Sequence, residues 1–449
     1  MVQQSRDRRA RTARNRVQDR AIVRLAVPAF LALVAEPLFL LADAVVVGRL
    51  GTPQLAGLGI AAVVLQTAVG VCIFLAYGTT AGVARRLGAG NLAGALAQGV
   101  DGLWLATLLG GILTPLGLLL TGPLVGAFGA SAQVEGYAAD YLRVAVLGIT
   151  PLLLMLAVTG VLRGLQDTST PLVVAVAGNL LNVVLNVALV YGAGLGIAGS
   201  ALGSVIAQVL SAAALVAVVL RAARREGASL RPDYAGVRQA GRAGGPLVVR
   251  TLTLRAALLL TTYAVSLGAA GGATEIATHQ LAMTLWGFLA FVLDAIAIAA
   301  QALTGRMLGA GDREGTRAVT RRMIQWGVLS GVVTGVGLAA LSPVLGALFT
   351  SDTDVRSLLV PVLLVAALAQ PAAGVVFVLD GVLIGAGDGA YLAWAGLATL
   401  ALYAPVVLVV AATGGGVVAV WAVFAGVFML GRLVTLVHRE RGEAWLITG

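Results

Sequence analysis

The sequence has few charged residues. Only 11% of its 449 residues are Asp, Glu, Lys or Arg, whereas about a quarter of a soluble globular chain is charged. Lysine is absent, so all 30 basic residues are arginine. Hydrophobic residues instead make up 59% of the chain. These proportions exclude a large soluble domain and indicate an integral membrane protein whose long apolar segments cross the bilayer as helices.

Residues that bind metals or act as nucleophiles are also scarce. The chain has two histidines and a single cysteine, Cys72, so no internal disulfide can form. No group of residues has the spacing of metal ligands or of a nucleophile and its base. We therefore expect no metal, no cofactor and no enzymatic activity. Nucleic acid is not an expected partner despite the net charge of +10, because aromatics make up only 5% and the arginines form short clusters beside apolar segments.

The apolar residues form twelve segments, each long enough for a membrane helix. They lie at 22–48, 54–84, 97–121, 136–162, 171–192, 197–220, 246–268, 275–304, 324–348, 357–384, 391–411 and 415–437. Arginines gather before the first segment, after the last, and in alternate loops between them. Since cytoplasmic loops retain positive charge, both termini are predicted to be cytoplasmic.

Short motifs recur at one separation along the chain. LGAGN at Leu87–Asn91 recurs as LGAGD at Leu308–Asp312, and their first glycines, Gly88 and Gly309, are 221 residues apart (309 − 88). VLRGLQD ends at Asp167 and VLIGAGD ends at Asp388, which are also 221 residues apart (388 − 167). A constant offset predicts a duplicated six-helix unit, whose copies are related by an axis along the membrane normal. The predicted organisation is a basic tail at 1–21, a first lobe at 22–221, a linker at 222–245, a second lobe at 246–438 and a tail at 439–449.

Two carboxylates lie in the first apolar segment. In EPLFLLADAVVVGRLG, Glu36 and Asp43 are seven residues apart and therefore lie on nearly the same helix face. An acid at bilayer depth is costly, and burial favours its neutral form, so such a group can take up a proton and release it when its surroundings rewet. Because two six-helix lobes related in this way are typical of secondary transporters, we predict that Asp43, together with Glu36, couples transport to an ion. Alternatively, Glu36 satisfies neighbouring polar groups or lies at a wet surface.

The fifth segment carries a stripe of amides. Asn179, Asn182 and Asn186 are spaced by three and four residues and share one helix face. Amides do not favour lipid, so they are expected to line a wet cavity or to bond to neighbouring helices, Asp43 included. Asn179 and Tyr141 are predicted to contact substrate.

The second lobe contains further charged residues within its apolar segments. Arg250, Asp294 and Asp380 lie in three different segments. Pairing reduces the desolvation cost of burying an arginine and an aspartate. We therefore predict that Arg250 pairs with Asp294 or Asp380. The alternative is that these three residues contact a second ion or the substrate in a cleft.

Several motifs together resemble one transporter family. EPLFLLADAVVVGRLGTPQLAGLGIA, RRLGAGN, VLRGLQDTSTPL and VLDGVLIGAGD resemble the multidrug and toxic compound extrusion (MATE) transporters, especially their DinF-like branch, and the resemblance covers 22–438. It implies an all-α protein with two six-helix lobes that form a V-shaped cleft. It also implies export of drug-like, often cationic or amphipathic compounds, driven by entry of protons or sodium, with Asp43 coupling to the ion.

The chain departs from the family pattern at one position. Many relatives have an asparagine in the fifth helix followed four residues later by an aspartate, and here the matching residues are Asn182 and Asn186. They are assigned to the ion-coupling site by this resemblance. Without the second carboxylate, a one-proton scheme centred on Asp43 is favoured, because sodium would need other oxygen ligands.

The sequence thus predicts a monomeric, multi-pass antiporter of the plasma membrane. Its partners are the lipid bilayer and a small-molecule substrate, and the coupling ion is the proton, with sodium as the other option. One alternative is a flippase or exporter of lipid-linked or saccharide intermediates, in which Arg250 and Arg255 would bind pyrophosphate. A second alternative is a membrane scaffold or sensor that does not transport.

Overall fold

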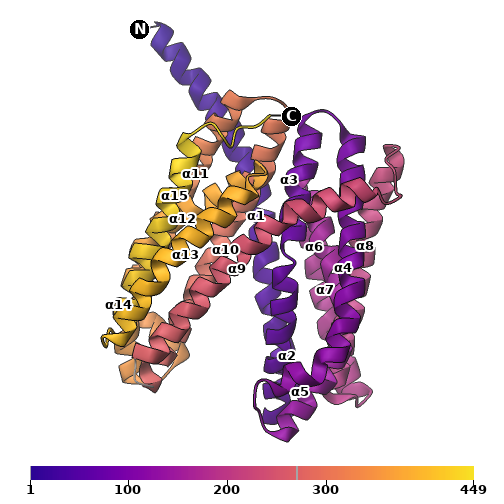
Figure 1. Ribbon diagram of the computed structural model, residues 1–449, viewed down its shortest axis with the longest axis vertical. Helices are drawn as coiled ribbons and strands as arrows, with labels where there is room; N and C mark the ends of the chain where they lie inside the picture. The colour runs from indigo at the N-terminus through magenta and orange to yellow at the C-terminus, as the bar shows by residue number, and fades with distance from the viewer. Residues whose placement is uncertain (1, 269–271, 449) are drawn as a thin grey trace. The chain divides into compact units, whose positions relative to one another are not determined.

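The structure, a computed structural model, describes residues 2–268 and 272–448, with side chains from Asn15 onward. This part of the chain contains no strand. Its helices are α1 (Val2–Gly48), α2 (Thr52–Val71), α3 (Phe74–Gly88), α4 (Leu92–Gly126), α5 (Ala132–Ala145), η1 (Val146–Gly148), α6 (Ile149–Gly164), α7 (Ser169–Val187), η2 (Ala188–Gly192), α8 (Gly196–Arg225), α9 (Tyr234–Gly268), α10 (Ala273–Gly309), α11 (Arg313–Phe349), α12 (Thr353–Gly385), α13 (Gly389–Ala412), α14 (Val417–Val423), η3 (Phe424–Met429) and α15 (Leu430–Arg441) (Figure 1).

These helices make twelve candidate membrane spans within the described residues. Some spans contain more than one element: α2 and α3 form the span Thr52–Gly88, and α5, η1 and α6 form Ala132–Gly164. Each of the twelve predicted apolar segments lies within one of these spans, apart from small differences at their ends. The prediction of an all-α protein with twelve spans is therefore confirmed.

The duplication predicted from the motifs recurs in the positions of the helices. α2 begins at 52 and α10 at 273, α4 at 92 and α11 at 313, and α5 at 132 and α12 at 353, so each pair differs by 221. The turns match as well. Gly90 and Gly311 have φ of 76° and 75°, a left-handed conformation that favours glycine. Asn91 and Asp312 then cap the next helix by accepting from the third amide beyond them.

Two compact units make up the chain. Unit 1 comprises Met1–Phe30 and Pro246–Gly449, and unit 2 comprises Leu31–Gly245. The divisions between them fall inside α1 and α9 and not in loops. α9 begins at Tyr234, twelve residues before the apolar segment at 246, and this polar first part packs in unit 2, where Gly244 faces Phe74.

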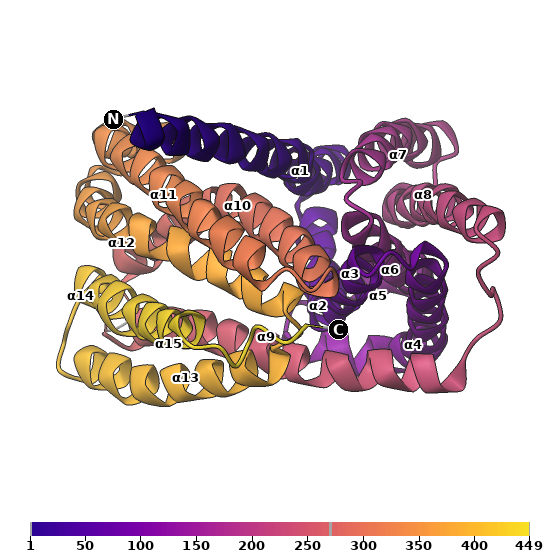
Figure 2. The same ribbon diagram turned by 90° about the horizontal axis from the view of Figure 1, so that it is seen from above.

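Glycines allow two helices of unit 1 to approach each other closely. α11 and α12 lie side by side (Figure 2), and Gly327, Gly331 and Gly335 recur every four residues on the face of α11 that meets α12. A Cβ at Gly327 would lie 2.5 Å from the carbonyl oxygen of Gly374, and one at Gly335 would lie 2.6 Å from that of Ala367. Small residues let membrane helices approach until their backbones are in contact. The contact between α11 and α12 through Gly327, Gly331 and Gly335, which we call the glycine seam, therefore depends on glycine.

Candidate functional site

Asp43 is the centre of a buried polar cluster in unit 2. Its side chain, on α1, is only 2% exposed. One carboxylate oxygen accepts a hydrogen bond from Nδ2 of Asn186 on α7, and the other accepts from Oγ of Ser204 on α8 at 3.3 Å. The acid is therefore held between two helices that are distant from it in sequence.

The partners of Asp43 also bond to one another. Asn182 donates from Nδ2 to Oγ of Ser204 at 2.9 Å, and its Oδ1 accepts from Asn186 at 3.1 Å. Tyr141, buried on α5, completes the cluster through a hydrogen bond between its hydroxyl and Ser204. Hydroxyls can donate one bond and accept two, so Ser204 can link the acid, the amide and the phenol at once.

Local sequence explains why these side chains meet. Residues spaced by four share a face of α7, which directs Asn182 and Asn186 to the same side. α8 approaches that face closely because Gly203 has no side chain: a Cβ there would lie 3.2 Å from the backbone nitrogen of Asn186 and closer still to its side chain. The glycine thus places the next residue, Ser204, against Asp43.

The hydrogen-bond partners recorded for Asp43 are all uncharged. Asn186 and Ser204 donate to it without bringing a positive charge, and no salt bridge to Asp43 occurs among the described residues. Oδ1 of Asn186 is buried and accepts no hydrogen bond in the structure. The cluster can therefore serve a carboxylate, which needs donors, and also offers an acceptor to a neutral carboxyl group, which carries a proton.

Two other predicted residues lie on the helices that carry this cluster, Glu36 on α1 and Asn179 on α7. Glu36 is exposed, which agrees with the alternative that it lies at a surface. Asn179 donates to the backbone oxygen of Ala35 at 3.0 Å, and Tyr191 donates to that of Val46 at 2.6 Å. α7 and η2 therefore bind α1 on both sides of Asp43 along the chain, at Ala35 and at Val46. The amides bond to neighbouring helices, which is one of the two arrangements expected for them.

A second buried cluster lies in unit 1. Asp380 on α12 accepts hydrogen bonds at the same oxygen from Arg250 on α9, at 2.6 Å, and from Arg432 on α15. Their side chains are only 6%, 13% and 9% exposed, respectively. The Arg250–Asp380 pair is one of the two pairings predicted. Asp294, the other candidate partner, is partly buried on α10.

A comparison with known families identifies the fold's relatives. The MatE family model matches residues 28–188 and 246–413, most of both predicted lobes. The chain belongs to the MATE family. MATE proteins are efflux transporters of drugs and toxic compounds, so this chain is a multi-pass membrane transporter and not an enzyme.

Individual relatives agree with this assignment. This MATE transporter is 31% identical to the chloroplastic protein DETOXIFICATION 44 of Arabidopsis thaliana, over 89% of this chain and 78% of the relative. It is 30% identical to DNA damage-inducible protein F of Escherichia coli, over 82% and 81%. The crystal structure of the Vibrio cholerae MATE transporter VcmN has the same fold, with a TM-score of 0.86 at 21% identity over 97% of this chain and 99% of VcmN.

The sequence did not reveal every member of the two clusters in this MATE transporter. Ser204 lies in the small-residue stretch AGSALGSVIAQ, where one serine does not stand out. Arg432 was a detectable signal, because it is a lone arginine within the last apolar segment, seven residues before Arg439. Among the described residues no group of three His, Cys, Asp or Glu side chains is placed to hold a metal ion.

Proposed function

We propose that this MATE transporter is a proton-coupled antiporter of the plasma membrane that exports small amphipathic molecules. The supporting observation is the setting of Asp43, a buried carboxylate held by neutral partners. Asp380, the comparable acid of unit 1, has two arginines as fixed counter-ions. Of the two acids, only Asp43 is free of a counter-ion that would oppose protonation.

Asn186 gives the cluster two ways to hold Asp43. When the acid is ionised, the amide nitrogen donates to it, as it does in this structure. When the acid is neutral, its hydroxyl proton can be donated to the amide oxygen, provided that the amide turns over. Oδ1 of Asn186 accepts no other hydrogen bond, so it is available for this proton, and the turn exchanges the bond from Nδ2 to Oδ1 of Asn182 for the new one. The proton therefore changes how α1 is bonded to α7.

The chemistry of the cluster favours the proton over sodium. Hard cations bind several oxygen ligands. The cluster offers the Asp43 carboxylate and Oδ1 of Asn186, whereas Oδ1 of Asn182 and Oγ of Ser204 already accept hydrogen bonds. Two residues are too few for a full set of oxygen ligands around sodium. The flippase alternative is disfavoured, because Arg250 is engaged by Asp380 and leaves Arg255 alone to bind a pyrophosphate.

Everted membrane vesicles provide the test. An imposed pH gradient should drive dye uptake by the wild type, and Asp43→Asn should lose this uptake while the purified protein keeps its helical content and melting behaviour. Asp140→Asn is the matched control, because Asp140 is exposed in an ion pair with Arg143; its transport should be normal. Normal uptake by Asp43→Asn would reject the role of Asp43. Uptake that needs sodium and survives a protonophore would reject proton coupling.

A further inference from the structure

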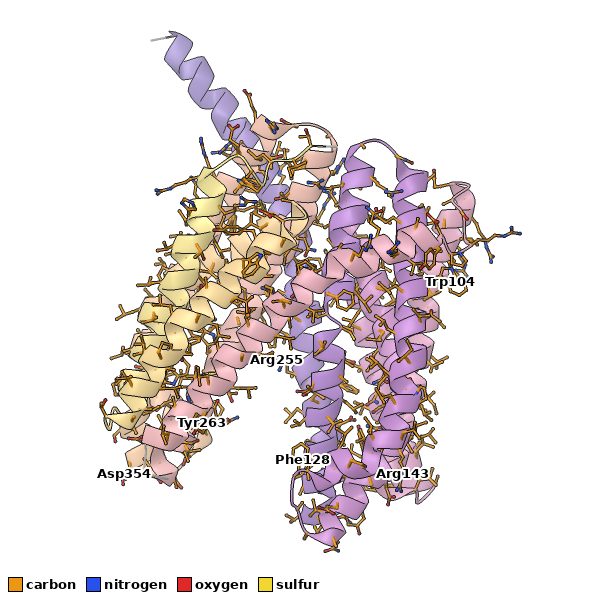
Figure 3. The ribbon with its side chains drawn as sticks, viewed as in Figure 1. Trp104, Phe128, Arg143, Arg255, Tyr263 and Asp354 are labelled. Atoms are coloured by element: carbon orange, nitrogen blue, oxygen red, sulfur yellow. The ribbon has the colours of Figure 1, made fainter. Side chains whose placement is uncertain are left out.

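One exposed face of α9 in unit 1 carries polar side chains within a membrane span. Exposed residues recur along α9 at spacings of about three and four, which places them on one face: Leu252, Arg255, Leu259, Thr262, Tyr263, Ser266 and Leu267. Figure 3 shows Arg255 and Tyr263 at successive levels of this helix. The face therefore combines a positive charge and hydroxyl groups with apolar side chains.

Arg255 lies deep in the membrane-spanning part of α9. It is nine residues after Pro246 (255 − 246) and thirteen before Gly268 (268 − 255). At a rise of about 1.5 Å per residue, these separations are about 14 Å and about 20 Å, and the hydrocarbon layer is about 30 Å thick. Within the described part of the chain the guanidinium forms no hydrogen bond or salt bridge. An arginine at this depth faces water and not lipid, because an unpaired charge in hydrocarbon is strongly disfavoured.

The lipid-facing surface of the same unit has a different composition. On α11 every exposed side chain from Val328 to Phe349 is apolar, as expected for a helix in contact with hydrocarbon. The exposed faces of α9 and α11 therefore meet different surroundings. We assign water to the face that carries Arg255 and lipid to the face that carries Val333.

We infer that Arg255 binds an anionic group of the transported molecule, and that substrates are amphipathic anions with a carboxylate, sulfonate or phosphate. This inference rests on the proposed export function and specifies its substrate class. A guanidinium presents several donors that suit oxyanions, whereas it repels a permanent cation. Leu259 and Tyr263, 70% and 58% exposed, lie on the same face and can contact the apolar body of such a molecule.

Thiol labelling tests whether Arg255 faces water. The only native cysteine, Cys72, is buried, and Cys72→Ala removes it. In this background, Arg255→Cys in liposomes should react with a membrane-impermeant methanethiosulfonate reagent from one side of the membrane, whereas Val333→Cys should not. If Arg255→Cys resists labelling from both sides as Val333→Cys does, Arg255 faces lipid and the inference fails.

Transport of two xanthene dyes tests the substrate class. Wild-type vesicles should accumulate anionic carboxyfluorescein, and Arg255→Gln should reduce its uptake at low dye concentration by about tenfold, as loss of one charge-assisted contact predicts. Arg255→Lys should retain most of the uptake. The control Arg238→Gln removes another exposed charge, from the polar first part of α9, and should transport normally.

The same assay separates this inference from the proposed function. Absence of Arg255-dependent carboxyfluorescein uptake overturns the substrate assignment, whether the wild type ignores the dye or Arg255→Gln carries it equally well. If cationic rhodamine 6G is still carried and Asp43→Asn abolishes its uptake, proton-coupled export stands while the anion preference falls. Loss of carboxyfluorescein uptake in Arg255→Gln, together with normal uptake by Asp43→Asn, would support the anion site and reject the coupling role.

Discussion

The glycine seam between α11 and α12 leads to a quantitative prediction. Gly327→Ala would place its Cβ 2.5 Å from the carbonyl oxygen of Gly374, 3.0 Å from the carbonyl carbon of that residue and 2.9 Å from Cγ2 of Val378. Two of these atoms belong to the backbone of α12 and cannot turn aside as the end of a flexible side chain can. The two helices must therefore move apart, and overpacking of this kind costs about 1–3 kcal/mol.

A second glycine of α11 provides the control. Gly337 has no atom within 4 Å of the position of a Cβ, so Gly337→Ala adds no clash. Both substitutions gain the same helix propensity, about 1 kcal/mol, and this gain cancels when the two variants are compared. Gly327→Ala should thus be less stable than Gly337→Ala by about 1–3 kcal/mol.

Unfolding in mixed micelles of SDS and a mild detergent can measure this difference. Both variants and the wild type are titrated with SDS while helical content is followed. The expected order of stability is Gly337→Ala first, then the wild type or Gly327→Ala, with the two variants clearly separated. Equal unfolding curves for the two variants would show that α11 and α12 do not meet through Gly327, and the packing argument would fail.

Two further predictions concern ion pairs of different burial. Asp380→Asn leaves Arg250 and Arg432 buried without their counter-ion and should lower the free energy of unfolding by about 3–5 kcal/mol. A loss below about 1 kcal/mol in the same SDS titration would contradict the described pairing. Asp19→Asn weakens the contact between Asp19 and Arg322, whose side chains are 26% and 28% exposed, and should cost about 1 kcal/mol or less because solvent screens the pair. A larger loss on titration would mean that Asp19 is better shielded than its exposure indicates.

The number of spans could be predicted from the sequence because the length of an apolar segment is a local property. The repeat was detectable for a related reason: turns such as those at Gly90 and Gly311 require glycine, and the same residue types therefore recur at the same offset. The first part of α9 was missed. It buries a narrow face, with Gly244 against Phe74, so its average composition resembles that of a polar linker.

Partners within the site were only partly predictable. Helical spacing placed Asn182 and Asn186 on one face, and the contact with Asp43 followed from that stripe. Spacing also placed Glu36 on nearly the same face of α1 as Asp43, yet Glu36 is exposed. Helical spacing gives the direction of a side chain around α1, but it does not specify which helices pack against α1 at that height. Ser204 and Arg432 depend on how α8 and α15 pack, which no local pattern records.

The two unit boundaries have a consequence for attempts to divide this protein. A gene cut in the loop between α8 and α9 would yield two fragments of similar size, each ending at a surface turn. The first fragment would carry Met1–Phe30, which packs in unit 1, and the second would carry Tyr234–Gly245, which packs in unit 2. Each fragment would lack a helical segment of its main unit, and the other fragment would carry that segment. The two fragments should therefore form complete units only when both are present, so that each supplies its segment to the other.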